Sequence, residues 1–239
     1  MIEVLPETGS TNADLAARLR DGETVPEGFW LVANRQTGGR GRQEREWRDG
    51  AGNFMGSTVV HLRHGDPAAG TLALLAGLAV FEVVSPCVTL PHEVRLKWPN
   101  DVMVGGAKLA GILLERERDA VVVGIGVNLA DAPVLQDREA ISLSQLGTPP
   151  DRDAFAGELA RLFDVELERW RNYRLGPIVQ RWLKAGHPPG TPLVVGEPRE
   201  TPLQGTFAGL TDEGALLLRF ADGTTRTINA GEVRLAGND

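Results

Sequence analysis

Hydrophobic and polar positions follow two periods along this chain, and together they predict a fold that contains both helices and strands. Apolar residues spaced three or four apart indicate a helix, because such positions share one helix face, whereas short apolar runs between turn residues indicate strands. The first pattern predicts one helix that begins after Ser10-Thr11-Asn12, and three others at residues 66–84, 151–173 and 177–184. The second pattern predicts strands at residues 2–5, 29–33, 54–61, 94–98, 102–104, 109–115 and 120–127.

Residues that favour helix starts support two of these helices. Serine, threonine and asparagine are strong N-cap residues, and after them Leu15 and Leu19 share one helix face. Asp66 and Pro67 fit an N-cap followed by the first helical position. The helix that Asp66 begins is apolar on nearly all sides, so we expect it to be a core element.

The pattern of apolar runs and turn residues changes at residues 186–192, which are Gly-His-Pro-Pro-Gly-Thr-Pro. Beyond this segment, short apolar runs separated by Gly and Asp turns predict strands at residues 193–195, 206–210, 215–220 and 225–228. Several short strands in a short segment are typical of a small β-barrel. We therefore predict two domains, residues 1–186 and residues 187–239.

The composition narrows the classes of protein that fit. The chain has 25 Lys and Arg against 32 Asp and Glu, a formal charge of −7, which disfavours a nucleic-acid binder because such proteins carry a basic surface. Cys87 is the only cysteine and the four histidines lack metal-ligand spacing, so a disulfide and a zinc site are not expected. No signal peptide is evident at the N-terminus, and the most apolar stretch, residues 71–84, is short for a membrane span. We expect a cytoplasmic protein with no membrane association.

The most informative segment is residues 36–47, Gln-Thr-Gly-Gly-Arg-Gly-Arg-Gln-Glu-Arg-Glu-Trp. Its three glycines allow backbone conformations with positive φ, and its three arginines suit carboxylate and phosphate groups. A tryptophan that ends the segment can cover an apolar or aromatic ligand. The segment therefore predicts a loop that closes over a small anion, although glycine-rich basic loops also bind phosphate backbones.

Four further segments have ordinary structural explanations when each is taken alone. Ser10-Thr11-Asn12 can be a plain N-cap, and residues 97–101, Lys-Trp-Pro-Asn-Asp, can be a turn. Lys108 can be a solvated lysine before the buried strand Leu-Ala-Gly-Ile-Leu-Leu-Glu. Residues 124–128, Gly-Ile-Gly-Val-Asn, can be a strand with close backbone packing.

In this order, however, the five segments resemble the motifs of the biotin–protein ligases. That family has S-T-N near the start, a G-R-G-R-x-x-R-x-W loop, K-W-P-N-D, K-x-x-G-I-L and G-x-G-x-N, and all of these are present here. The resemblance covers essentially the whole chain. It implies an α+β fold, with a mixed, largely antiparallel central sheet flanked by helices as in class II synthetases, and a C-terminal SH3-like barrel. Because the first predicted strand begins at Ile2, we expect the branch without an N-terminal DNA-binding domain.

The resemblance also implies the reaction and the partners. The family uses ATP to activate biotin as biotinyl-5′-AMP, then transfers biotin to a lysine of a biotin carboxyl carrier protein, the acceptor of biotin–[acetyl-CoA-carboxylase] ligase. Mg²⁺ is expected with the nucleotide. Many relatives are dimers, so a homodimer is expected. The chemistry needs no enzyme nucleophile, which agrees with a Cys87 that lies outside every motif.

The match to the family assigns roles residue by residue. Lys108 and Arg42 are the expected catalytic residues. The expected biotin-binding residues are Ser10, Thr11, Asn12, Gln36, Gly39, Arg40, Gly41, Arg42, Lys108 and Gly111. The expected nucleotide-binding residues are Arg42, Arg45, Trp47, Asn100, Asp101, Lys108 and Asn128. Arg48 is expected to be solvated and Trp98 to be structural, while the metal ligands stay unassigned.

Three alternatives remain at this point. A lipoyl or octanoyl transferase, a related acyltransferase of the same fold, could use a cysteine nucleophile, but Cys87 lies outside every motif. A lipoate–protein ligase shares the fold class and the adenylation chemistry, but a urea-containing ligand needs deep polar groups such as Thr11 and Gln36, and a dithiolane does not. A nucleic-acid-binding module could use the arginine loop, but the net charge disfavours it.

Overall fold

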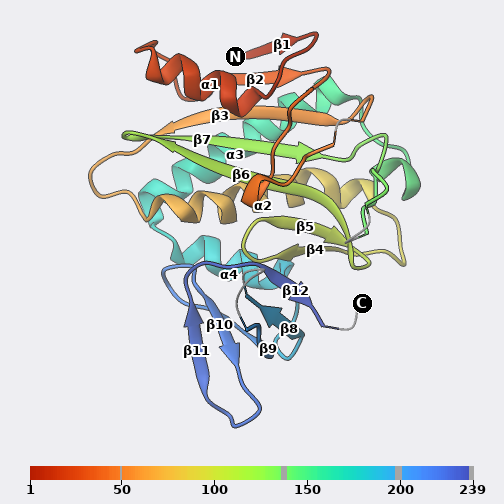
Figure 1. Ribbon diagram of the computed structural model, residues 1–239, viewed down its shortest axis with the longest axis vertical. Helices are drawn as coiled ribbons and strands as arrows, with labels where there is room; N and C mark the ends of the chain where they lie inside the picture. The colour runs from red at the N-terminus through yellow and green to blue at the C-terminus, as the bar shows by residue number, and fades with distance from the viewer. Residues whose placement is uncertain (49, 136–138, 197–200, 237–239) are drawn as a thin grey trace.

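Two β-sheets organise the part of the chain that the computed structural model describes, which is residues 1–48, 50–135, 139–196 and 201–236. The larger sheet has seven described strands in the order β1-β2-β3-β7-β6-β5-β4 (Figure 1). Its strands are β1 (Ile2–Leu5), β2 (Trp30–Ala33), β3 (Phe54–His61), β4 (Val94–Lys97), β5 (Asp101–Val104), β6 (Ala107–Glu117) and β7 (Ala120–Val127). Only β1 and β2 pair in parallel among these, so the expected mixed, largely antiparallel sheet is confirmed.

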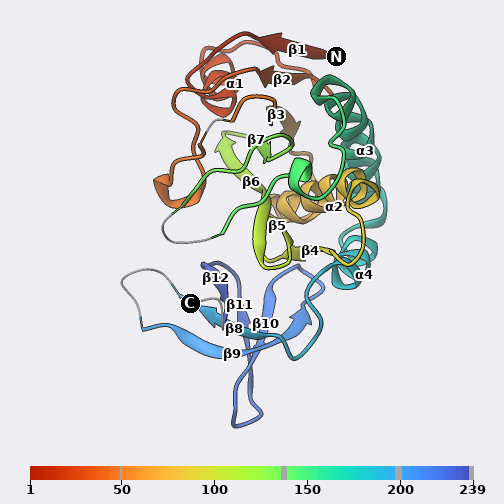
Figure 2. The ribbon, with the colours of Figure 1, turned by 90° about the vertical axis from the view of Figure 1, so that its right-hand side faces the viewer.

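Helices cover the two faces of this sheet unequally. Its helices are α1 (Thr11–Arg20), α2 (Leu72–Val84), α3 (Arg152–Tyr173) and α4 (Gly176–Ala185). Figure 2 shows α2, α3 and α4 on one side, whereas α1 and the loop before β3 lie on the other. Side chains alternate between the faces of a strand. On β7, Val121 and Val123 therefore join the core beneath α2, while Val122 joins the smaller core beneath α1.

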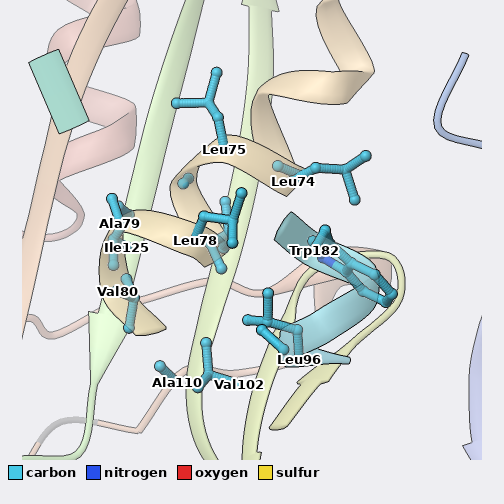
Figure 3. Packing of buried hydrophobic residues seen from close by; sticks show 14 of the residues in the cluster. Leu74, Leu75, Leu78, Ala79, Val80, Leu96, Val102, Ala110, Ile125 and Trp182 are labelled. Carbon is cyan, nitrogen blue, oxygen red and sulfur yellow. The ribbon is translucent and has the colours of Figure 1, made fainter. Parts of the chain in front are cut away.

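The main core forms because α2 is apolar on nearly all sides, with Glu82 as its one charged residue. Leu75 and Leu78 of this helix are almost fully buried and pack in one cluster with Leu96, Val102 and Ile125 of the sheet (Figure 3). By length and a mean hydropathy of 1.7, the described segment Ala69–Cys87 would suffice to cross a membrane, which the shorter stretch seen in the sequence did not suggest. Because 67% of it is buried inside the protein, we interpret it as a core helix.

The start of this helix differs from the prediction. Regular helix begins at Leu72 after a short 3₁₀ turn, Ala69–Thr71, rather than at Asp66. The Asp66 carboxylate instead accepts a hydrogen bond from the Arg63 backbone N–H at 2.9 Å and lies 3.6 Å from the Arg171 guanidinium of α3. A tertiary ion pair thus engages the residue that would otherwise cap the helix.

The C-terminal strands form a second sheet in the order β11-β10-β9-β8-β12, below the first sheet in Figure 1. They are β8 (Pro192–Val195), β9 (Leu203–Leu210), β10 (Leu216–Arg219), β11 (Thr225–Ile228) and β12 (Val233–Leu235), the last of which was not predicted. Since β11 and β12 are the two edges of the described sheet, the sheet is open, and the expectation of a closed barrel is not met in the described residues.

The second sheet packs against the first part of the chain through apolar contacts. The rings of Trp182 on α4 and Phe207 on β9 lie 6.2 Å apart, in the same cluster as α2. A Cβ placed on Gly214 would lie 2.8 Å from Leu74 of α2, so a glycine permits this close approach. The core is thus continuous across residue 186, and the division into two domains stays a prediction.

Candidate active site

A cavity of about 1040 Å³ lies on the face of the large sheet opposite α2, and residues of all five motif segments line it. Its volume is at the upper end of the range for small-molecule sites. The predicted site residues in its wall are Ser10, Thr11, Asn12, Gln36, Arg40, Gly41, Arg42, Arg45, Trp47, Asn100, Asp101, Lys108 and Gly111.

Glycines on β6 and β7 make the room for this cavity. A Cβ on Gly126 would lie 2.3 Å from Trp47 Cε2, and a Cβ on Gly124 would lie 2.2 Å from Asn12 Oδ1. A Cβ on Gly111 would lie 2.9 Å from Lys108 Nζ. Real Cβ atoms do not approach so closely. The motif glycines therefore form the floor on which Trp47, Asn12 and Lys108 rest.

One end of the cavity is polar and buried. Ser10 caps α1 by accepting a hydrogen bond from the Ala13 N–H, and Thr11 is 3% exposed in the first turn. Gln36 Oε1 accepts from the Thr11 backbone N–H at 2.8 Å and from its hydroxyl at 3.0 Å. Thr11 and Gln36 are thus held together as one polar unit in the cavity wall.

Two residues of this polar end were missed by the sequence reasoning. Ser57 on β3 is fully buried and hydrogen-bonds both Thr11 and Asn12, and Glu115 on β6 accepts from Asn12. Ser57 had a signal in the sequence, because it and Thr58 are hydroxyl residues within a strand predicted to be buried, where such groups are nearly always paired. Glu115 ends the lysine motif, where the sequence pattern predicts only the end of a strand.

The opposite part of the cavity is cationic. Lys108 makes an ion pair with one oxygen of Asp101, and Lys97 lies 3.0 Å from the other oxygen. Burial alone would raise the pKa of the Asp101 carboxyl, but the ammonium groups of Lys108 and Lys97 hold that pKa well below its usual range. Asp101 is therefore an anion that orients two lysines. Its expected direct contact with a nucleotide stays a prediction.

The arginine loop reaches from this cationic region to the C-terminal sheet. Arg42 donates to Asn100 Oδ1 at 3.3 Å and to the Gly231 carbonyl at 3.2 Å. Arg45 makes a two-point ion pair with Glu232, at 2.7 Å for one of its bonds. Glu232 and its neighbour Arg234 also line the cavity, so the C-terminal sheet contributes residues that no motif indicated.

Gly39 and Asn128 lie outside the wall of the large cavity. A Cβ on Gly39 would lie 2.6 Å from the Trp47 carbonyl oxygen, so Gly39 is packed behind Trp47 rather than presented to a ligand. Asn128 donates to the Ile141 carbonyl at 3.2 Å and lines a small adjoining pocket of about 30 Å³ with Trp47 and Lys108. The structure therefore does not bring Gly39 to the cavity surface, whereas it places Asn128 next to the cavity.

Two polar atoms beside this small pocket have no partner among the described residues. They are Trp47 Nε1, a donor, and Asn128 Oδ1, an acceptor, and both are buried. Buried polar atoms are nearly always hydrogen-bonded, so an unpaired donor and acceptor beside a cavity are candidates for hydrogen bonds to a ligand.

Two further expectations concern residues near the site. Arg48 is exposed, with 53% of its side chain accessible, as expected of a solvated residue. Trp98 is 5% exposed, and its indole N–H donates to the Gly214 carbonyl at 3.0 Å. Trp98 thus ties the large sheet to the C-terminal sheet, as expected of a structural residue, and it also lines the cavity.

This chain is similar in sequence to known protein families and to individual proteins. Residues 5–129 match the family model described as "Biotin/lipoate A/B protein ligase family", and residues 197–235 match "Biotin protein ligase C terminal domain". The chain is 38% identical to a biotin–[acetyl-CoA-carboxylase] ligase of Mycobacterium tuberculosis (strain ATCC 25618 / H37Rv), over 97% of this chain and 88% of the relative. It is 36% identical to the enzyme of the same name from Paracoccus denitrificans, over 98% of this chain and 100% of the relative.

The fold is also similar to solved structures. The structure of a biotin protein ligase from Aquifex aeolicus in complex with biotin and ATP superposes with a TM-score of 0.85 at 25% identity, over 98% of this chain and 99% of that one.

Proposed function

The chain belongs to the biotin protein ligase family, and we propose that the cavity described above is where it activates biotin with ATP and transfers biotin to an acceptor lysine. The enzyme is a ligase of the biotin–[acetyl-CoA-carboxylase] type. One observation carries the assignment of the site: a single cavity brings a buried polar end and a cationic end together. Such a cavity matches a ligand with a urea at one end and a carboxylate at the other.

In the first step, a carboxylate oxygen of biotin attacks the α-phosphorus of ATP. The bond from that phosphorus to the bridging oxygen of the β-phosphate breaks, and pyrophosphate leaves. Lys108 and Arg42 stabilise the negative charge that both reactants carry, so this chain contributes positioning and electrostatic stabilisation. The Lys108–Asp101 ion pair keeps the ammonium in place before the substrates bind.

In the second step, the uncharged amine of the acceptor lysine attacks the carbonyl carbon of the biotinyl-adenylate. The bond from that carbon to the phosphate oxygen breaks, AMP leaves, and the nitrogen releases a proton to solvent. Trp47 Nε1 and Asn128 Oδ1 suit the acceptor and donor atoms on the edge of adenine. We assign these two residues to the nucleotide, and we assign Arg45 there because it lies in the cavity wall beside Arg42.

The described residues do not form a dedicated metal cage, because they contain no group of three His, Cys, Asp or Glu side chains that could hold an ion. Mg²⁺ commonly binds through substrate phosphates and one or two carboxylates. We therefore propose that Mg²⁺ enters with ATP, held chiefly by its phosphates. The ion would offset the charge of those phosphates.

The acceptor and the assembly are also proposals. The names of the relatives support a biotin carboxyl carrier protein as the acceptor. We further propose a cytoplasmic homodimer that binds neither DNA nor membranes. The net charge of −7 disfavours DNA. At an edge of the described sheet, β1 exposes Ile2 and Val4, at 37% and 42%, which suits strand pairing between copies.

Exchange of labelled pyrophosphate into ATP tests the function directly. We expect exchange that depends on biotin and not on lipoate. The bonds between Thr11 and Gln36 leave lone pairs on the Thr11 oxygen and the Gln36 NH₂ group for a ligand, and a urea can bond to both whereas a dithiolane cannot. Exchange with lipoate alone would instead assign the chain to the lipoate branch of the family. No exchange with either acid would overturn the proposed function.

Hydrogen exchange across residues 38–53 tests how the cavity closes, and the structure describes all of these except residue 49. The loop is polar and glycine-rich, so the Arg45–Glu232 ion pair and the packing of Trp47 offset only part of its ordering entropy of ~1–2 kcal/mol per residue when no ligand is bound. We expect biotin to increase protection here while β7 stays unchanged. Closure would shield the reactive anhydride from water. Equal protection with and without biotin would show that the loop is preformed.

A further inference from the structure

A chain of buried hydrogen bonds leads away from the cavity at its polar end. Asn12 Nδ2 donates to Glu115 Oε2 at 2.7 Å, and Ser57 Oγ donates to Asn12 Oδ1 at 2.6 Å. Ser57 Oγ in turn lies 2.7 Å from Thr11 Oγ1. Asn12, Ser57 and Thr11 are each at most 4% exposed, so water does not compete for the bonds among them, whereas Glu115 is partly exposed. Glu115 lies behind the cavity wall, at the far end of the chain of bonds.

The direction of every bond in this chain follows from Glu115. An ionised carboxylate can only accept, so Asn12 must turn its amide nitrogen toward Glu115 and its oxygen toward Ser57. The single proton of Ser57 is then committed to Asn12, and Ser57 can only accept from Thr11. The acceptor character of the carboxylate fixes this direction, whichever way round the amide oxygen and nitrogen of Asn12 are drawn.

The consequence appears at the cavity. The 2.7 Å contact between the Thr11 and Ser57 hydroxyls needs one proton, and Ser57 has none left, so Thr11 donates its proton to Ser57. Gln36 Oε1, 3.0 Å from the Thr11 hydroxyl, keeps its bond from the Thr11 backbone N–H, and the lone pairs of the Thr11 oxygen are left for a ligand. The side-chain oxygen of Gln36 accepts a hydrogen bond from the Thr11 backbone N–H, so the NH₂ group of Gln36 is left as a donor for a ligand. A cyclic urea offers N–H donors and a carbonyl acceptor, which complements one acceptor and one donor in this wall.

We propose that Glu115 is a positioning residue which, through Asn12 and Ser57, fixes the Thr11 hydroxyl as an acceptor for a ureido N–H of biotin. This inference rests on the proposed function and adds to it a determinant of specificity. The floor of the site is built for this arrangement, because Gly124 leaves the space that the Asn12 side chain fills. If the Thr11 hydroxyl pointed its proton at the ligand, it would face the ureido N–H, and one of these two donors would be left unpaired in a buried site.

A charge exchange between positions 12 and 115 tests the direction of the relay. Asn12→Asp would place two carboxylates 2.7 Å apart, where an amide and a carboxylate now meet. We expect it to raise the KM for biotin by about 10-fold or more. Glu115→Gln can present either end of its amide to Asn12, so we expect a smaller rise.

The double variant, which combines Asn12→Asp with Glu115→Gln, restores a matched pair in the reverse order. The new amide at position 115 can donate to one oxygen of the new carboxylate at position 12, while Ser57 donates to the other oxygen. The proton of Ser57 therefore stays committed to position 12, as in the wild type. We expect the double variant to recover the wild-type KM for biotin within about threefold.

The readouts separate positioning from simple structural damage. In the variants, the KM for ATP and the melting temperature should change little. Binding of desthiobiotin, which keeps the urea, should weaken in parallel with binding of biotin. Glu117→Gln is the matched control, because it removes a carboxylate on the same face of β6 that pairs with Arg20 instead of the relay. Its KM for biotin should equal that of the wild type.

Defined outcomes overturn the relay. The proposal fails if Glu115→Gln and Asn12→Asp both keep the wild-type KM for biotin, or if the double variant shows the sum of the single losses. Should Asn12→Asp not fold, Ser57→Ala decides instead, and an unchanged KM for biotin in that variant overturns the relay. A wild-type protein without biotin-dependent exchange would overturn the proposed function, whereas an active wild type with unaffected variants would overturn the relay alone.

Discussion

Replacing Lys108 with alanine is expected to lower the rate of biotinyl-adenylate formation by about 100-fold or more, the usual scale for losing one electrostatic stabiliser. Its ammonium lies in the cavity wall, 5.9 Å from the centre of the Trp47 ring, so it sits beside both proposed substrates. Folding should change little, because Asp101 keeps its second ion pair, with Lys97, at 3.0 Å. Single-turnover measurement of adenylate formation, with the melting temperature as a check on folding, tests this expectation.

Lys97→Ala is the informative comparison for this variant. It removes the other ammonium from the same Asp101 carboxylate, so it disturbs the local charge balance in the same way. We expect a smaller loss, because Lys97 is not one of the residues matched to the reacting groups. An equal loss in the two variants would assign the effect to Asp101 and its orientation. Normal adenylate formation in Lys108→Ala would refute the role of this lysine altogether.

The elements that local patterns determine were predictable from the sequence. Short, mostly apolar runs located β3 and β7 with their observed bounds, and a helix-spaced apolar face located α3 to within one residue. The start of α2 was wrong because the ion pair of Asp66 with Arg171 is a tertiary contact that local capping preferences do not include. Strand β12 was missed because three residues carry too little pattern.

The site divides in the same way between local and long-range information. The motifs identified most of the cavity wall because each holds its residues at fixed spacing on one strand end or loop. The contact between Arg45 and Glu232 joins residues 187 positions apart, and it depends on how the C-terminal sheet docks. The role of Glu115 could not be predicted without the strand order. Only the pairing of β6 with β7, and of β7 with β3, brings Glu115 near Asn12 and Ser57.

Arg42 differs from Lys108 in its bonding partners. Lys108 pairs with a charged carboxylate, whereas the neutral partners of Arg42 can easily be exchanged for a ligand. Arg42 donates to two neutral oxygens, on Asn100 and Gly231, at 3.3 and 3.2 Å, which are long for hydrogen bonds. A phosphate or carboxylate would offer shorter, charge-assisted bonds to the same guanidinium. Arg42 can therefore leave the neutral acceptors for the adenylate when it forms, while Arg45 keeps the loop attached through Glu232.

Arg42→Gly is accordingly expected to weaken retention of biotinyl-5′-AMP by about 2–4 kcal/mol, the scale of removing one partner from a buried charged pair. That loss corresponds to roughly 30- to 1000-fold faster escape if association is unchanged. The released anhydride would then react with lysines of nearby proteins regardless of their sequence. Arg35→Gly is the matched control, because it makes the same change at an exposed arginine that pairs with Glu7 and lines neither pocket, so it should leave retention intact. A stopped-flow chase measures the dissociation rate, and a rate in Arg42→Gly equal to that of Arg35→Gly would show that Arg42 does not hold the intermediate.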